Sequence, residues 1–287
     1  MKAIYLREIT EYFKSIVAYV FIAILLLFTG IYTLAVNINT GSSQFEFVIN
    51  SMSYIFVTLV PLLTMRVVAE EKRQRTDRLL YSLPVSMTKV VLGKFFAILT
   101  VFAVPTLIIC TYPLILHEYG DLFYPRAYSA IFGLFMMGAA LFSVGIYISS
   151  ITENQSIAGV VTFMALLANY FLTSITQYFS SSAVFSLVAF AVLIAGFGAV
   201  LYYMIRHAVF SAVITAVLEA ILLILYIARP GRFEGAFAAA VNSIAVFEKL
   251  TLFVTGVFSL GAIVFFLSVI VIFLFLSIQT LEKSRWS

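Results

Sequence analysis

The chain has 287 residues, of which 63% are hydrophobic and 10% are charged, with a net charge of +4. Soluble domains contain roughly 45–50% apolar and about 25% charged residues, so this composition excludes a soluble fold and requires hydrocarbon as the solvent. The basic residues lie between apolar stretches, where they orient membrane spans, and we therefore do not expect the chain to bind nucleic acid. The single cysteine, Cys110, excludes a disulfide within the chain and a thiolate zinc site.

Residues 1–15 precede the first apolar stretch and combine a row of apolar side chains at helical spacing with charged side chains around it. The pattern predicts an amphipathic helix that lies along the lipid headgroups. The alternative is a basic flank that only orients the first span.

Eight apolar stretches are long enough to cross a membrane, since a span needs about 20 residues. They lie near 15–36, 51–69, 95–116, 128–150, 156–178, 183–205, 208–228 and 257–280. Continuous apolar runs favour helices over a barrel, whose strands have about 10 residues of alternating polarity. We therefore predict an all-α membrane protein, a polytopic helical bundle of about eight transmembrane helices in a single domain over residues 1–287.

The basic residues are distributed unequally between the two sides of this bundle. One side has Lys2, Arg7, Lys14, Arg66, Lys72, Arg73, Arg75, Arg78, Lys89, Lys94, Arg206, Lys283 and Arg285, and the other has Arg126, Arg229, Arg232 and Lys249. The positive-inside rule places the richer side in the cytoplasm, so we expect both termini of a multi-pass plasma-membrane protein there. The pair 183–228 needs a tight turn at Arg206, and if that hairpin fails to cross, six spans with the same orientation remain.

The longest polar stretch, residues 70–94, begins with Glu70 and Glu71. Its centre predicts a short helix that starts at Thr76 or Asp77 and stops at Pro84. This helix has Leu79, Leu80 and Leu83 on one face. Because a helix of barely two turns is unstable alone in water, its leucines need the membrane surface or a groove on a protein, and we predict a docking element. The alternative is a helix packed on its own bundle.

Two further charged residues and one outer segment also lead to predictions. Glu219 lies deep in an apolar run, where a carboxylate costs roughly 2.5–3.5 kcal/mol, so it can line a substrate path, pair with another chain or remain protonated inside the bundle. Arg66 is expected to snorkel or to pair with Glu70 one helical turn later. Residues 229–256 place Phe233, Phe237, Val241 and Ile244 at helical spacing, which predicts an external amphipathic helix.

Three segments together resemble the type-2 ABC transporter permeases, especially the gliding-motility and nitrous-oxide-maturation branch. They are PLLTMRVVAEEKRQRTDRLLYSLPVSMTKVVLGKF at 61–95, ISSITENQS at 148–156 and FLFLSIQTLEKSRW at 273–286. The resemblance implies half of an exporter, with 1–15 as an elbow helix and with a separate ATPase subunit that binds ATP and Mg. The hairpin 183–228 is extra relative to the six-span core of that family.

The same resemblance implies roles for individual residues and partners. Contact with the ATPase would come from Glu70, Glu71, Thr76, Asp77, Arg78, Leu79, Leu80, Leu83 and Pro84, with a secondary contact at Thr152, Glu153 and Asn154. A second permease copy or a paralogue, membrane lipid and an exported substrate of unknown identity complete the expected partners.

No nucleotide or metal chemistry is expected on the chain itself. The only Gly-Lys, at residues 93–94, has Thr88 where a P-loop needs its first glycine and Phe95 where it needs Ser or Thr. We therefore expect no cofactor on this chain and no enzymatic activity. Two alternatives remain: an ion-gradient-driven secondary transporter that uses Glu219, and a non-transporting membrane scaffold or immunity protein.

Overall fold

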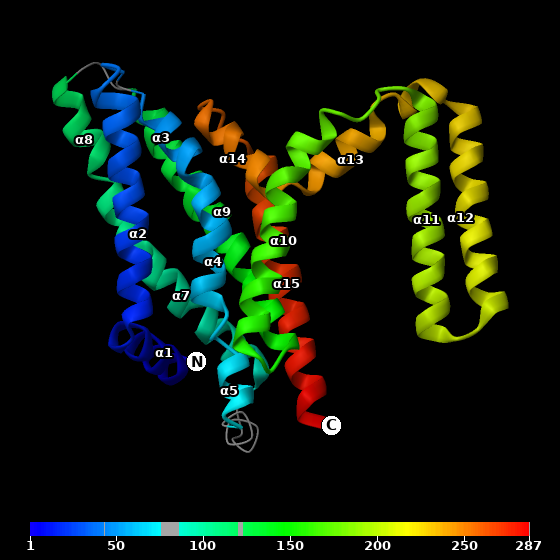
Figure 1. The fold of residues 1–287 in the computed structure, drawn as a ribbon, viewed down its shortest axis with the longest axis horizontal. Helices are drawn as coiled ribbons and strands as arrows, with labels where there is room; N and C mark the ends of the chain where they lie inside the picture. Colours follow the sequence, from blue (N-terminus) through cyan, green and yellow to red (C-terminus); the bar gives the residue numbers. More distant parts are fainter. Residues whose placement is uncertain (43, 76–85, 120–122, 287) are drawn as a thin grey trace. The chain divides into compact units, whose positions relative to one another are not determined.

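The computed structural model describes residues 1–42, 44–75, 86–119 and 123–286, and within these ranges the chain is helical without strands (Figure 1). Eight helices of the described part are long and apolar enough to cross a membrane. They are Ile16–Ile38, Phe45–Arg73, Met87–Leu116, Tyr124–Ile151, Gln155–Thr176, Ala183–Tyr203, Ala208–Ala228 and Leu260–Arg285. The predicted all-α bundle of eight spans is confirmed, although the second and third helices begin six to eight residues before the predicted apolar runs.

The chain forms two compact units, which we describe separately. Unit 1 comprises Met1–Tyr170 and Val246–Ser287, and unit 2 comprises Phe171–Ala245. Helix α10 (Gln155–Thr176) begins in unit 1 and ends in unit 2.

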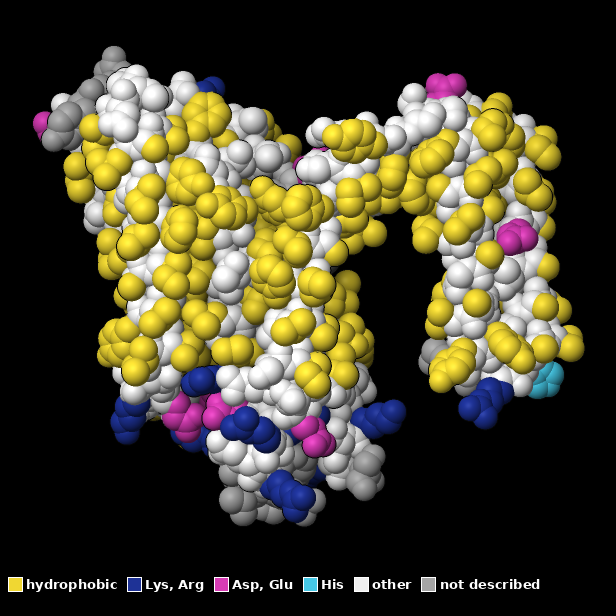
Figure 2. All heavy atoms as spheres, in the orientation of Figure 1, with side chains coloured by type: hydrophobic (Ala, Val, Ile, Leu, Met, Phe, Trp, Pro, Cys, Tyr) yellow, Lys and Arg dark blue, Asp and Glu magenta, His cyan; other side chains and the backbone are white. Residues whose placement is uncertain are grey.

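Unit 1 contains most of the helices. In chain order they are α1 (Lys2–Lys14), α2 (Ile16–Tyr32), η1 (Thr33–Ile38), α3 (Phe45–Met52), η2 (Ser53–Ile55), α4 (Phe56–Thr64), α5 (Ala69–Arg73), α7 (Met87–Ile109), α8 (Tyr112–Leu116), η3 (His117–Tyr119), α9 (Tyr124–Ile151), α14 (Val246–Val254) and α15 (Leu260–Trp286). Helices α1 and α5 and the end of α15 lie at one end of the unit (Figure 1). We call this end the charged end, since Lys, Arg, Asp and Glu side chains gather there below an apolar surface (Figure 2).

Helix α1 is separated from α2 by a single residue. Ser15 has an extended backbone, with φ −90° and ψ 143°, and its hydroxyl accepts a hydrogen bond from the N–H of Val17 at 3.3 Å. The same residue therefore ends one helix and caps the next, which lets α1 turn away from the axis of α2. The predicted helix near residues 1–15 is present, and its position on a membrane surface stays a prediction.

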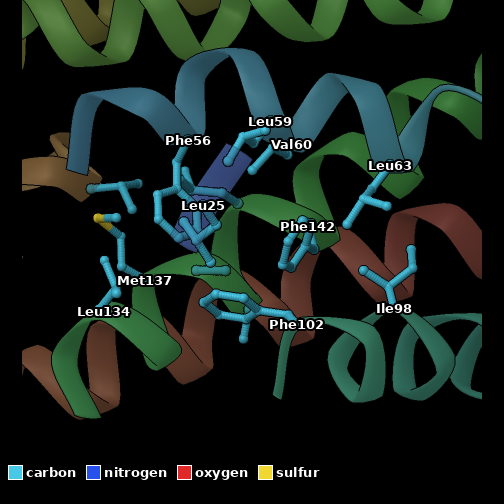
Figure 3. Close-up of a cluster of buried hydrophobic side chains, with 14 of the residues drawn as sticks. Leu25, Phe56, Leu59, Val60, Leu63, Ile98, Phe102, Leu134, Met137 and Phe142 are labelled. Carbon is cyan, nitrogen blue, oxygen red and sulfur yellow. The ribbon is translucent and has the colours of Figure 1, made fainter. Parts of the chain in front are cut away.

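The core of unit 1 is packed around α9. Phe102 of α7 contacts Phe56 and Phe142 edge to face, with ring centroids 5.4 and 5.5 Å apart (Figure 3). A Cβ on Gly138 of α9 would lie 2.5 Å from the Phe102 ring, so only glycine allows the two helices to approach this closely. A small residue at this position of α9 thus permits close helix packing.

Unit 2 contains a helical hairpin and two short helices. Helices α11 (Ala183–Ile205) and α12 (Ala208–Ala228) are joined by Arg206 and His207, and Arg206 has the left-handed φ of 54° that the tight turn requires. Both helices are long and apolar enough to span a membrane. They bury only 11% and 6% of their apolar windows within the chain, so lipid or another polypeptide must cover the rest.

The outer segment differs from its prediction. Instead of one helix through Phe233 and Ile244, the structure has η4 (Pro230–Phe233), α13 (Ala236–Ile244) and, in unit 1, α14. Gly235 has φ 67° and Ala245 is extended, so the helical pattern is interrupted on both sides of α13. Phe233 therefore does not share a helix with Phe237.

Candidate coupling site

The predicted docking segment begins at α5, which the charged end of unit 1 holds in place from several sides. The N–H groups of Val68 and Ala69 donate hydrogen bonds of 3.2 and 3.1 Å to the hydroxyl of Ser149, which is fully buried near the end of α9. Lys72 Nζ donates to the carbonyl of Ser150 at 2.6 Å. A cation that binds a carbonyl at a helix C-terminus also stabilises the negative end of the helix dipole. These contacts fix α5 to the end of α9.

A buried lysine links α5 to two further helices. Lys94, in the second turn of α7, has a side chain that is only 2% exposed. Its ammonium lies 3.0 Å from a carboxylate oxygen of Glu8 in α1 and 2.9 Å from one of Glu71 in α5, and it donates to the carbonyl of Val67 at 2.8 Å. All three donors of the ammonium therefore have an acceptor.

Arg7 of α1 completes the group that we call the ion cluster, consisting of Arg7, Glu8, Glu71 and Lys94. Its guanidinium lies 2.7 Å from Glu71 and 2.9 Å from Glu8, so two cations and two carboxylates surround one another. Partial burial lowers the pKa of Arg7, but its hydrogen bond to Glu8 and the nearby carboxylates outweigh this and raise that pKa above its ordinary value. Arg7 consequently stays charged.

The neighbouring carboxyl group of Glu11 lies at the edge of this cluster, 3.5 Å from Arg7. Burial raises the pKa of Glu11, and the negative charge of Glu8 raises it further, against the opposing effect of Arg7 and Lys94. The pKa of Tyr12 is raised well above its usual value by burial, consistent with its neutral hydroxyl donating to the carbonyl of Leu63 at 3.3 Å.

Close packing of α1 on α7 brings the ion cluster together. A Cβ on Gly93 would lie 3.1 Å from a methyl carbon of Ile4, tighter than most real contacts. Glycine at this position therefore lets the two helices approach, and it places the adjacent Lys94 beside Glu8.

Of the two alternatives for Arg66, pairing with Glu70 is wrong and snorkelling stays a prediction. Helix α4 ends at Thr64 and α5 begins at Ala69, so Arg66 lies on the intervening turn and is not one helical turn before Glu70. Glu70 instead accepts a hydrogen bond from Gln74 at 3.1 Å. Among the residues that the structure describes, Arg66 forms no ion pair within 4.0 Å.

The other predicted contact residues fall into two groups, one outside the described residues and one in the turn after α9. Thr76, Asp77, Arg78, Leu79, Leu80, Leu83 and Pro84 lie outside the described residues. Thr152, Glu153 and Asn154 form the short turn after α9, where Thr152 accepts from the N–H of Asn154 and Asn154 caps α10 by accepting from that of Ser156 at 2.9 Å. The turn follows Ser149 and Ser150 after one residue, so the structure brings it to the same end of unit 1 as α5, which carries Glu70 and Glu71.

Glu219 lies on α12 in unit 2. It borders a shallow groove between α11 and α12 whose floor consists of small residues such as Gly198, Ser211 and Thr215. No described residue forms an ion pair or a hydrogen bond with its carboxylate. All three alternatives for Glu219 stay predictions: a residue of the substrate path, a partner of another chain, and a protonated carboxyl inside the bundle.

Sequence reasoning missed the residues that hold α5 in place. Lys94 was considered as part of a defective P-loop and, like Lys72, as one of the basic residues that orient the spans, and Ser149 was given no role. The position of Lys94 directly before the apolar run 95–116 was the available signal, because an ionisable residue at the end of a span either snorkels to the interface or has a partner. Nothing in the sequence indicated that the partners were Glu8 and Glu71.

The described residues contain no group of three or more His, Cys, Asp or Glu side chains that could hold a metal ion. The ion cluster and the buried hydrogen bonds of Ser149 instead hold helices α1, α5, α7 and α9 together.

Comparison with known families agrees with this architecture. The model of the ABC-2 family transporter proteins matches residues 32–229, well over half of the chain. The chain belongs to the ABC-2 transporter family. No curated protein and no solved structure matches it. Members of this family are membrane components of ABC transporters and are generally not catalytic, so this ABC-2 protein is a multi-pass permease component. The match runs through the hairpin at residues 183–228.

Proposed function

We propose that this ABC-2 permease is half of an exporter, that its charged end faces the cytoplasm, and that residues 70–94 receive the motion of a separate ATPase subunit. The observation that carries the proposal is the attachment of α5 to α1, α7 and α9. Through the ion cluster and the hydrogen bonds of Ser149 and Ser150, a displacement of the segment that follows α5 is passed to three other helices at once.

Charge and sequence support the assignment of sides and of the partner. The positive-inside rule favours a cytoplasmic location for the charged end, where Figure 1 shows the first helix of unit 1 and the end of its last helix. The chain has no P-loop, so ATP and Mg would be bound by the partner. The closer likeness to the gliding-motility and nitrous-oxide-maturation branch rests on the three sequence segments quoted above. A second permease copy or a paralogue would form the other half of the exporter.

The test is co-purification with a cassette ATPase encoded beside the gene of this chain. The double substitution Asp77→Lys with Leu80→Asp replaces one charge and one apolar anchor of the predicted docking helix. We expect it to lower the recovered ATPase at least about tenfold, as for loss of a central interface residue, while the permease elutes unchanged. The control is Glu234→Lys, a charge reversal in the segment that follows α12 and η4. Equal recovery with the double variant and the control would contradict the proposed docking site.

The ion-gradient alternative makes a separate prediction. If Glu219 carries a proton or a sodium ion, then Glu219→Gln stops transport in vesicles that contain the permease without any ATPase. Transport that requires ATP and the cassette subunit, and that survives Glu219→Gln, excludes this alternative.

A further inference from the structure

A pocket of about 600 Å³ opens at the charged end of unit 1, beside the ion cluster. Tyr12, Val17 and Leu63 contribute apolar walls, and Arg66, Glu70 and Glu11 lie around the polar part. The pocket thus spans the boundary at which α1 and the turn after α4 meet the apolar surface of the spans. In a membrane this is the depth of the phospholipid headgroups.

Some of the charged side chains that line the pocket form close ion pairs with one another, and others do not. Arg7 and Lys94 are paired with Glu8 and Glu71 at 2.7–3.0 Å, so the ion cluster neutralises itself. Outside the ion cluster, the charged lining residues are one cation, Arg66, and two carboxylates, Glu70 and Glu11, of which Glu11 also lies 3.5 Å from Arg7. Arg66 has no ion-pair partner in the described part of the chain, and Glu70 has only the amide of Gln74.

The remaining charges define the chemistry of a ligand. A guanidinium recognises a phosphate through paired N–H donors, whereas carboxylates recognise an ammonium that can donate hydrogen bonds. A purely anionic headgroup would meet more carboxylates than cations in this pocket. A quaternary ammonium has no N–H group to donate. The matching ligand carries one phosphate, one primary amine and apolar chains.

We infer that this pocket binds the headgroup of an amine-bearing zwitterionic phospholipid, with its phosphate on Arg66 and its ammonium on Glu70 and Glu11. The apolar side chains of Val17 and Leu63 would then face the start of the acyl chains. The lipid would bridge α1 to the turn before α5, beside the contacts of the ion cluster. This site does not depend on whether the permease is driven by an ATPase.

The experiment is a lipid titration of the full-length chain, purified in mild detergent and depleted of lipid, with binding counted by native mass spectrometry. The ligands are phosphatidylethanolamine, phosphatidylcholine and phosphatidylglycerol of matched acyl chains, and soluble phosphoethanolamine. We expect one phosphatidylethanolamine to bind about tenfold more tightly than either other lipid, in keeping with a charge-assisted hydrogen bond.

Two substitutions and one control locate the site. Arg66→Gln and Glu70→Gln should each weaken binding of phosphatidylethanolamine about tenfold or more. Arg73→Gln removes the same charge from the exposed end of α5 without touching the pocket and should leave binding within about twofold. Circular dichroism and gel filtration check that each variant is folded.

Four outcomes would contradict the binding of phosphatidylethanolamine in this pocket. Binding of phosphatidylglycerol as tight as that of phosphatidylethanolamine would overturn the inference, as would an equal loss of binding in Arg66→Gln and Arg73→Gln. Unchanged binding in both pocket variants would show that the lipid lies elsewhere. If soluble phosphoethanolamine bound as tightly as the lipid, the ligand would be a soluble phosphoamine and the lipid assignment would be wrong.

Discussion

Replacement of Lys94 by methionine tests whether the ion cluster stabilises the charged end of unit 1. The substitution preserves much of the side-chain length but removes the ammonium that lies 3.0 Å from Glu8 and 2.9 Å from Glu71. Glu8, with a side chain only 6% exposed, is then left with Arg7 as its sole described cation. Removing one member of a buried ion pair costs about 3–5 kcal/mol because the other charge stays buried without compensation.

A loss of this size should be easy to measure. We expect the melting temperature of the full-length chain in detergent to fall by roughly 6–20 °C. The matched control is Lys89→Met on the same helix, since Lys89 is exposed and forms no ion pair with any described residue. Its effect should stay within about 0.5 kcal/mol.

A second substitution separates the buried charge from the lost packing. In the double variant Lys94→Met with Glu8→Gln, the buried carboxylate that has lost its buried cation and keeps only the half-exposed Arg7 is gone, so the double variant should be more stable than Lys94→Met alone. The reasoning is refuted if Lys94→Met melts like Lys89→Met, or if the added Glu8→Gln lowers the melting temperature further.

Two more substitutions test contacts that position the same helices. Ser149→Ala leaves the N–H groups of Val68 and Ala69 without their shared acceptor and should destabilise the chain by about 1–3 kcal/mol in a thermal unfolding assay, whereas Ser268→Ala, at an exposed position on α15, should have little effect. Equal melting temperatures for the two serine variants would show that the buried hydroxyl contributes nothing. Gly138→Ala places a methyl group 2.5 Å from the Phe102 ring and should cost about 1–3 kcal/mol, while Gly196→Ala enters open space and should be neutral; a neutral Gly138→Ala would mean that α7 and α9 separate freely.

The sequence was sufficient to predict the number and the type of the membrane spans. A segment that crosses hydrocarbon must satisfy its backbone hydrogen bonds internally and present apolar side chains, and both requirements are visible in one stretch of residues. For the same reason the tight turn at Arg206 and the break at Ser15 fall where the apolar runs are interrupted. Two local predictions are wrong. In the outer segment the pattern of phenylalanines concealed the interruption at Gly235, and near Arg66 the apolar run concealed the turn between α4 and α5.

The candidate coupling site depended on the tertiary structure. Lys94 binds Glu8 across 86 positions of sequence, and Ser149 accepts from Val68 across 81, so neither pair forms a local pattern. Lys94 meets Glu8 because glycine at position 93 lets α1 pack closely on α7. Arg66 and Glu70 do not meet because a turn separates α4 from α5. Apolar periodicity is written in consecutive residues, whereas the partner of a buried charge is decided by which helices pack together. The sequence by itself therefore determined a membrane bundle with a charged end, and only the packing of α1, α5, α7 and α9 decided which of those charges meet.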